Sequence, residues 1–218
     1  MAYEQLKAIS PIDGRYLSKC EELNEIFSEY GLIKRRILVE CVWLEALCDD
    51  AGIKECRRLS PKERSLLKSV AENVSLEDAQ RVKDIEKTTN HDVKAVEYFL
   101  KEKIKGTSLE SRSEFIHFGC TSEDINNMSH ALMLRDGKNI LRKAMDEMTA
   151  IIASTAKKYA SKPMLAHTHG QSASPTTVGK ELAVVSQRLK RQALEIDRLV
   201  PADTPVTVNG GKVAFTAK

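Results

Sequence analysis

Residues 121–152 read TSEDINNMSHALMLRDGKNILRKAMDEMTAII and decide the fold class. The hydroxyls and acids of Thr121-Ser122-Glu123-Asp124 are typical of a helix start, because they can cap unpaired backbone N–H groups. Apolar residues then recur at helical spacing. They are Ile125, Met128, Leu132, Leu134, Ile140, Leu141, Met145, Met148, Ile151 and Ile152. We therefore expect the longest helix of the chain to begin near Glu123 and to end before Ser161.

The segments on either side of this stretch also carry helical patterns. Residues 22–51 repeat apolar positions without a proline and predict one long helix, and Ser60-Pro61-Lys62-Glu63 combines an N-cap, a proline and a capping-box glutamate. Further helices are expected from Ser75 onward, over residues 92–105 and over residues 178–199, with residues 162–175 as a loop. The sequence predicts an all-α fold without a parallel sheet.

The pattern changes beyond residue 199. Pro201 and Pro205 stop the helix, and residues 206–215 alternate apolar and polar side chains around Asn209-Gly210. An Asn-Gly pair between alternating segments is a strong hairpin signal. We expect two short strands there.

The composition favours an ordinary globular protein, with 42% hydrophobic and 30% charged residues in a chain of 218. Its 34 Lys and Arg nearly cancel 31 Asp and Glu, so the net charge of +3 argues only weakly for nucleic acid or an anionic membrane. No run approaches the roughly 18 apolar residues of a spanning helix, and we expect a cytoplasmic protein. The five cysteines form no C-x-x-C pair, which favours reduced structural thiols.

Three polar clusters at expected helix starts or loops have the most chemical potential. They read TNHD at residues 89–92, CTSED at 120–124 and HTHGQ at 167–171. A helix start presents unpaired N–H groups and the positive end of a dipole, so each cluster could bind a carboxylate or a phosphate. Helix capping is the competing interpretation, and it is favoured for Thr121 and Ser122 on their residue types alone.

Two histidines in these clusters, His91 and His169, are candidate acid/base groups because imidazole exchanges a proton near neutral pH. His167 and His169 would point to the same side of an extended segment, as a metal-binding pair does, but further ligands do not accompany them. We expect no metal. His117 and His130 lie among apolar residues and receive no role.

Four motifs occur together in one order: SPIDGRY at residues 10–16, KTTNHDVKAVE at 87–97, FGCTSEDINN at 118–127 and THGQ at 168–171. Jointly they resemble the N-terminal half of the bacterial adenylosuccinate lyases, a family of the fumarase and aspartase superfamily. The resemblance extends from about Leu6 to about Arg198.

The resemblance implies an N-terminal helical domain over residues 1–112 and the first, incomplete part of a central helical bundle over residues 113–199. Residues 200–218 form a tail that departs from the family pattern. Members of this family are homotetramers whose active sites each take residues from three subunits. His91 and His169 would then meet from different chains.

The implied reaction is an elimination that releases fumarate from a purine nucleotide carrying a succinyl group, without a metal or an organic cofactor. By resemblance His169 is the general acid that protonates the leaving nitrogen, and His91 is a second catalytic residue that also holds the substrate. Arg15 and Tyr16 would bind the nucleotide phosphate. The other implied substrate-binding residues are Asn90, Asp92, Thr121, Ser122 and Gln171.

The family's catalytic serine loop, of the form Ser-Ser-x-Met-Pro-x-Lys-x-Asn, does not occur in this sequence. We therefore expect little lyase activity from this chain alone. One alternative is a non-catalytic helical module that binds a nucleotide or associates with an intact lyase. Another is a related enzyme that releases fumarate from argininosuccinate, aspartate or malate.

Overall fold

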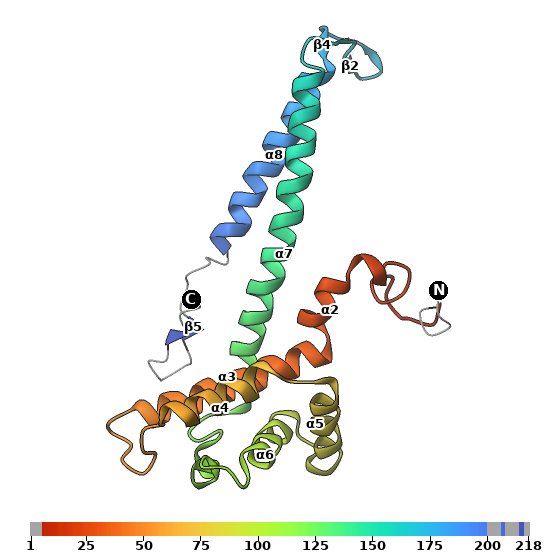
Figure 1. The fold of residues 1–218 in the computed structure, drawn as a ribbon. Coiled ribbons are helices and arrows are strands. Elements are labelled where there is room, and N and C mark those ends of the chain that lie inside the picture. Colours follow the sequence, from red (N-terminus) through yellow and green to blue (C-terminus); the bar gives the residue numbers. More distant parts are fainter. Residues whose placement is uncertain (1–5, 200–205, 208–213, 216–218) are drawn as a thin grey trace. The chain divides into compact units, whose positions relative to one another are not determined.

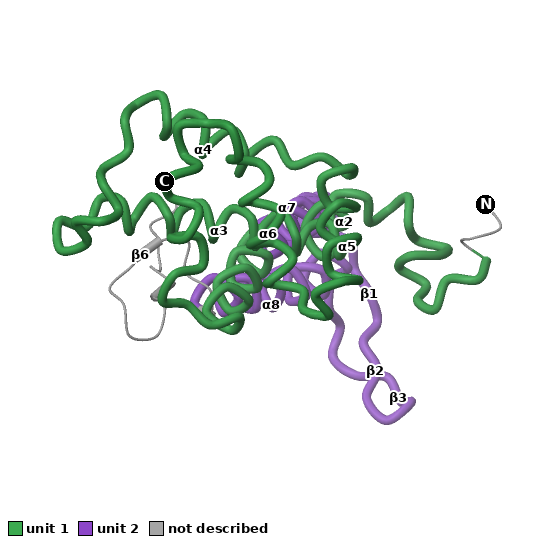
Figure 2. Tube along the Cα trace, turned by 90° about the horizontal axis from the view of Figure 1, so that it is seen from below, with its two compact units in different colours: residues 1–136, 205–218 green, residues 137–204 purple. Residues whose placement is uncertain are grey.

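The computed structural model describes residues 6–199, 206–207 and 214–215. The chain forms two compact units, residues 1–136 with 205–218 and residues 137–204 (Figure 2). Helix α7, Ser122–Lys158, passes from the first unit into the second. The boundary predicted near residue 112 concerns the family's domains and stays a prediction.

The first unit is helical in its described part up to residue 136 (Figure 1). Helix α3 packs against α4, α5 and α6, so its apolar side chains form the centre of the core. Ile37 on α3, Val96 on α6 and Leu109 are fully buried. The elements are η1 Leu17–Lys19, α2 Glu21–Phe27, α3 Glu29–Asp49, α4 Pro61–Glu72, α5 Leu76–Thr89, α6 Asp92–Ile104, η2 Glu110–Phe115 and the start of α7.

The single helix predicted over residues 22–51 is wrong, because the chain breaks at Ser28. Ser28 has an extended backbone, and its hydroxyl caps α3 by accepting the N–H of Gly31. A Cβ on Gly31 would lie 2.4 Å from the carbonyl oxygen of Ile26, so only glycine permits this close return of the chain. The missed signal was a serine followed by a glycine three residues later.

Predicted capping elsewhere is confirmed. Ser60 and Glu63 form a reciprocal capping box at the start of α4, and Ser75 and Asp78 form another at the start of α5. Helix α6 ends before Gly106, which has a φ of 74°. These caps satisfy N–H groups that would otherwise lack partners and fix where each helix begins.

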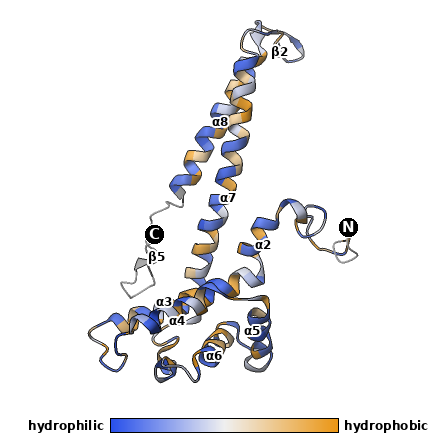
Figure 3. Cartoon of the chain, viewed as in Figure 1, coloured by the Kyte–Doolittle hydropathy of each residue, from blue (hydrophilic) through white to orange (hydrophobic). Residues whose placement is uncertain are grey.

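The second unit contains the later part of α7 and α8, Val178–Leu199. Gly179 permits a close approach between these helices, because a Cβ there would lie 2.4 Å from the carbonyl oxygen of Ala156. Arg142 on α7 also pairs with Asp197 on α8. Hydrophobic residues recur along both helices (Figure 3), and several of their large apolar side chains are exposed. These include Leu141, Met148, Ile151, Val184, Val185 and Leu194.

The loop predicted between α7 and α8 is instead a pair of nested two-residue ladders. Strand β1, Pro163–Met164, pairs antiparallel with β4, Thr176–Thr177, and β2, His167–Thr168, pairs antiparallel with β3, Gln171–Ser172. Ladders this short lack the alternation that predicts strands, which explains why the sequence favoured a loop.

The two short strands predicted in the tail are confirmed as β5, Val206–Thr207, and β6, Ala214–Phe215, which pair antiparallel. The predicted Asn209-Gly210 turn lies outside the described residues. All sheets in the described part of the chain are antiparallel. None of its helices is long and apolar enough to cross a membrane.

Candidate active site

Asn90 and His91 join α5 to α6 and give the TNHD motif its local structure. Asn90 has a φ of 50° and ends α5, with its N–H donating to the carbonyl of Glu86. Asparagine tolerates this left-handed conformation better than most residues. His91 is the N-cap of α6, where its Nδ1 accepts the N–H of Lys94 at 3.2 Å. The motif therefore ends α5 and begins α6, with only Asn90 and His91 between the two helices.

The same ring of His91 connects this motif to the start of α7. Because Nδ1 accepts a hydrogen bond, a neutral His91 carries its proton on Nε2. Nε2 lies 3.2 Å from the hydroxyl oxygen of Ser122, so the ring donates to that hydroxyl. The proton of the Ser122 hydroxyl stays available for another acceptor. The side chain of His91 is 48% exposed, so a ligand can reach this pair.

Two helix N-termini converge at this hydrogen bond, α6 at His91 and α7 at Ser122. Thr121 precedes α7, and both its N–H and its hydroxyl donate to Asp124. Asp124 therefore caps this helix start, whereas the Thr121 hydroxyl donates and does not accept an N–H as the predicted N-cap would. The positive dipole ends of the two helices favour a carboxylate or a phosphate at this position.

Arg36 on α3 bonds to both motifs, the one at residues 89–92 and the one that begins α7. Its guanidinium donates to Asp92, the first residue of α6, and its Nε donates to the amide oxygen of Asn126 on α7 at 2.9 Å. Partial burial raises the pKa of Asp92, but the Val93 N–H and the Arg36 charge more than offset this, and the pKa lies below its usual value. Asp92 therefore stays ionised and bound to Arg36 at neutral pH.

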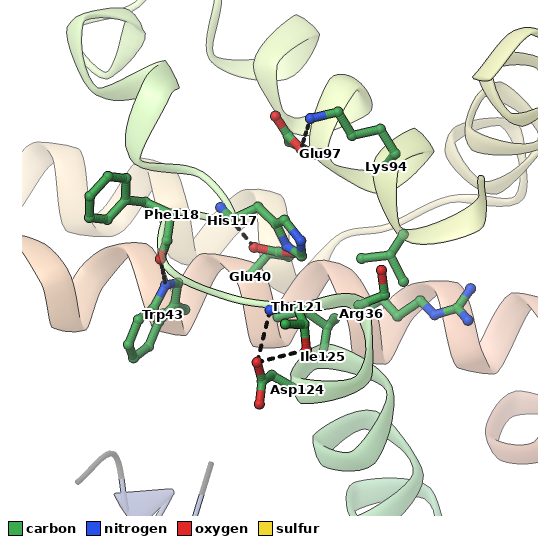
Figure 4. Close-up of polar contacts among 12 residues, drawn as sticks. Arg36, Glu40, Trp43, Lys94, Glu97, His117, Phe118, Thr121, Asp124 and Ile125 are labelled. Atoms are coloured by element: carbon green, nitrogen blue, oxygen red, sulfur yellow. Dashed lines mark hydrogen bonds and ion pairs between the residues drawn. The ribbon is translucent and has the colours of Figure 1, made fainter. Parts of the chain in front are cut away.

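Glu40, one turn further along α3, holds the segment that leads into α7 (Figure 4). One carboxylate oxygen accepts the N–H of His117 at 3.1 Å, and the other lies 2.6 Å from its Nδ1. This hydrogen bond raises the pKa of His117 although burial opposes it. Trp43 adds a bond from its indole N–H to the carbonyl of Phe118 at 2.8 Å. Sequence reasoning missed this anchor and assigned His117 no role.

An apolar cluster lies next to these polar contacts. Val39 of α3, Val93 of α6, and Ile125 and Met128 of α7 pack together and are almost fully buried. Val93 follows His91 by two residues and Ile125 follows Ser122 by three. Packing of the three helices therefore fixes the distance between the two side chains.

The other predicted site residues lie elsewhere in the chain. Arg15 and Tyr16 are exposed near the start of the first unit, where the guanidinium lies 5.5 Å from the ring centroid. His169 and Gln171 are exposed in the second unit. His169 and Gly170 both have positive φ and form the two-residue turn between β2 and β3. The extended segment predicted to align His167 with His169 is therefore wrong.

Comparison with known proteins agrees with the motifs. The sequence pattern of the lyase family matches residues 14–218. Adenylosuccinate lyase of Haemophilus influenzae is 51% identical over 198 residues, which cover 88% of this chain and 42% of that protein. Adenylosuccinate lyase of Escherichia coli K12 is 47% identical over 201 residues, which cover 91% of this chain and 44% of that protein. The chain thus spans less than half the length of these curated relatives.

Solved structures support the same fold. A fumarate lyase from Mesorhizobium sp. BNC1 superposes with a TM-score of 0.69 at 21% identity, over 88% of this chain and 42% of that one. A 3-carboxy-cis,cis-muconate lactonizing enzyme from Pseudomonas putida superposes with a TM-score of 0.64 at 23% identity, over 82% and 39% of the two chains. The chain belongs to the lyase family of the fumarase and aspartase superfamily, as its motifs predicted.

Proposed function

We propose that this chain is part of an adenylosuccinate lyase, which eliminates fumarate from adenylosuccinate and from the related succinyl-carboxamide ribotide of purine synthesis. The observation that carries the proposal is the His91–Ser122 pair at two converging helix N-termini, because it suits an anionic substrate. The relatives of that name, with identities of 51% and 47%, support the choice of substrate.

In this proposal the residues of the first unit bind and orient the substrate. The Ser122 hydroxyl holds a carboxylate of the succinyl group, while Thr121 and the TNHD motif, Asn90 to Asp92, lie beside it. Arg15 and Tyr16 hold the nucleotide phosphate, since a guanidinium forms paired charge-assisted bonds to phosphate oxygens. The exposed positions of Arg15 and Tyr16 leave them open to a ligand.

His169 is the proposed general acid, and Gln171 holds the succinyl group beside it. The exposed turn that carries His169 belongs to the second unit, whereas His91 belongs to the first. A homotetramer would allow His169 of one chain to act beside His91 of another. The open apolar side chains of α7 and α8 support such an assembly, because large apolar side chains exposed along two long helices are suited to burial against another chain. We place the enzyme in the cytoplasm.

The proposal is tested with a completed chain, in which this chain is joined to the remaining part of the Haemophilus influenzae relative. Fumarate release is followed by absorbance with adenylosuccinate, argininosuccinate, aspartate and malate as substrates. We expect turnover of adenylosuccinate alone and little or none by the 218-residue chain. Nucleotide binding by a completed chain that turns over none of the four would instead support a binding module.

A further inference from the structure

Two buried charges on one face of α3 have no part in the proposed chemistry. Arg36 and Glu40 are four residues apart, so they lie one above the other on the helix, and they are only 5% and 0% exposed. Burying a charge is costly even when it is paired, and well-packed apolar side chains often give equal or greater stability. Stability alone therefore does not account for them.

Each charge binds a different part of the His91–Ser122 site. Arg36 holds Asp92, which directly follows His91, and it also holds Asn126 in the first turns of α7. Glu40 holds both the N–H and the ring of His117, in the segment that leads into Ser122. One helix face thus fixes both partners of the hydrogen bond.

The backbone of His117 adds independent evidence. Its φ of 62° lies in the left-handed region, which is unfavourable for a residue with a Cβ. Such conformations persist only where surrounding contacts enforce them, and they occur often at functional sites. Here the two bonds to Glu40 enforce the conformation.

We propose that Arg36 and Glu40 are positioning residues that set the distance and orientation of His91 relative to Ser122. Arg36 orients His91 through Asp92, and Glu40 orients Ser122 through His117. The functional importance of this alignment rests on the proposed role of the pair in binding substrate. The alignment itself is a physical property of the chain that can be measured without activity.

The test uses the 218-residue chain and the imidazole nitrogen NMR signals of His91, which report its tautomer and the hydrogen bond that Nε2 makes. We compare the wild type with Glu40→Gln, which keeps the shape and removes the charge. Glu63→Gln is the matched control, since Glu63 is also buried and bound to a cation, Arg112, away from the site. His117→Asn is a second test variant, because asparagine accepts a positive φ and loses the ring contact.

We expect wild type and Glu63→Gln to show His91 with its proton on Nε2 alone. Glu40→Gln and His117→Asn should shift the Nε2 signal of His91, because its hydrogen bond to Ser122 is misplaced while the Lys94 N–H still holds Nδ1. They should also bind adenylosuccinate roughly tenfold or more weakly, as small misplacements are costly. Unchanged His91 signals in both folded variants would overturn the proposal, as would an equal change in Glu63→Gln. Absence of adenylosuccinate binding by the wild type would count against the proposed function, while the comparison of Nε2 signals still decides the positioning role.

Discussion

The Nε2 atom of His91 and the hydroxyl oxygen of Ser122 lie 3.2 Å apart, although 31 positions separate the two residues in the chain. Each residue belongs to a different polar motif and stands at the start of a different helix. The contact therefore joins two local helix-capping segments into one site. Each motif alone caps a helix. Together they place the Ser122 hydroxyl, whose proton is free for an acceptor, between the positive ends of α6 and α7.

Ser122→Ala in the completed chain should weaken adenylosuccinate binding by roughly tenfold, because it removes one hydrogen bond to a charged group. Stability should change little, since Asp124 keeps capping the start of α7. Ser129→Ala is the control, because this hydroxyl is buried on the same helix and bonds to the carbonyl of Ile125. Titration calorimetry checks both variants, and equal affinities for Ser122→Ala and wild type would remove Ser122 from the site.

The His117–Glu40 contact should make stability depend on pH. The folded-state pKa of His117 is raised above its ordinary value of 6.5, so the contact stabilises fully below 6.5 and is lost as pH rises through the folded pKa. Lys94 and Glu97 of α6 also act on this ring, in opposite directions. The loss of unfolding free energy in His117→Asn should therefore be larger at about pH 6 than at about pH 9 in urea titrations. A loss independent of pH would contradict the ion pair.

Glu63 should protect the fold against acid. The N–H of Ser60, the Ser60 hydroxyl and Arg112 lower the pKa of Glu63 from 4.5 to about 2, despite burial. A depressed pKa contributes stability that is complete above 4.5 and is lost as pH falls toward 2. Glu63→Gln should cost roughly 3 kcal/mol at neutral pH, because it leaves Arg112 without its charged partner. Urea titrations over this range should show the variant and wild type converging in acid, and a constant gap would exclude the ionised pair as the cause.

The cysteines should differ sharply in reactivity. Burial, and secondly a hydrogen bond to Cys56, raise the pKa of the Cys48 thiol to about 12, and burial raises that of Cys120 to about 12. Thiols react as thiolates, so these groups should resist an aromatic disulfide reagent in the native state. Half-buried Cys20 should react first, and Cys41, like Cys56, should react only on unfolding. A fast phase that survives Cys20→Ser would show that another thiol is open.

The sequence predicted those parts of the fold whose signals are local. Capping residues and helical spacing predicted helices α4 to α8, because both patterns depend only on residues that are close in the sequence. The break at Ser28 was missed although its signal is local, because the apolar spacing continues across Ser28 and Gly31 as it would in one helix. The ladders flanking His169 were missed because strands of two residues carry no periodicity.

The motifs named the candidate site residues, but the contacts that hold them could not be predicted. Arg36 and Glu40 lie in an ordinary helical stretch, and their partners Asn126 and His117 are 90 and 77 positions away. Nothing local distinguishes them from solvated charges. Only the packing of α3 against α6 and α7 shows that they are buried and paired.

Fumarate release by mixed variants tests the central claim most directly. His91→Ala and His169→Ala forms of the completed chain should each lose on the order of a hundredfold to ten-thousandfold in kcat, as the loss of an acid/base group does. If the two histidines meet from different chains, mixing the two variants during refolding should restore part of the activity, because some sites then contain both intact residues. Full activity of either variant alone would contradict their roles, and two inactive variants that never regain activity on mixing would contradict a site shared between subunits.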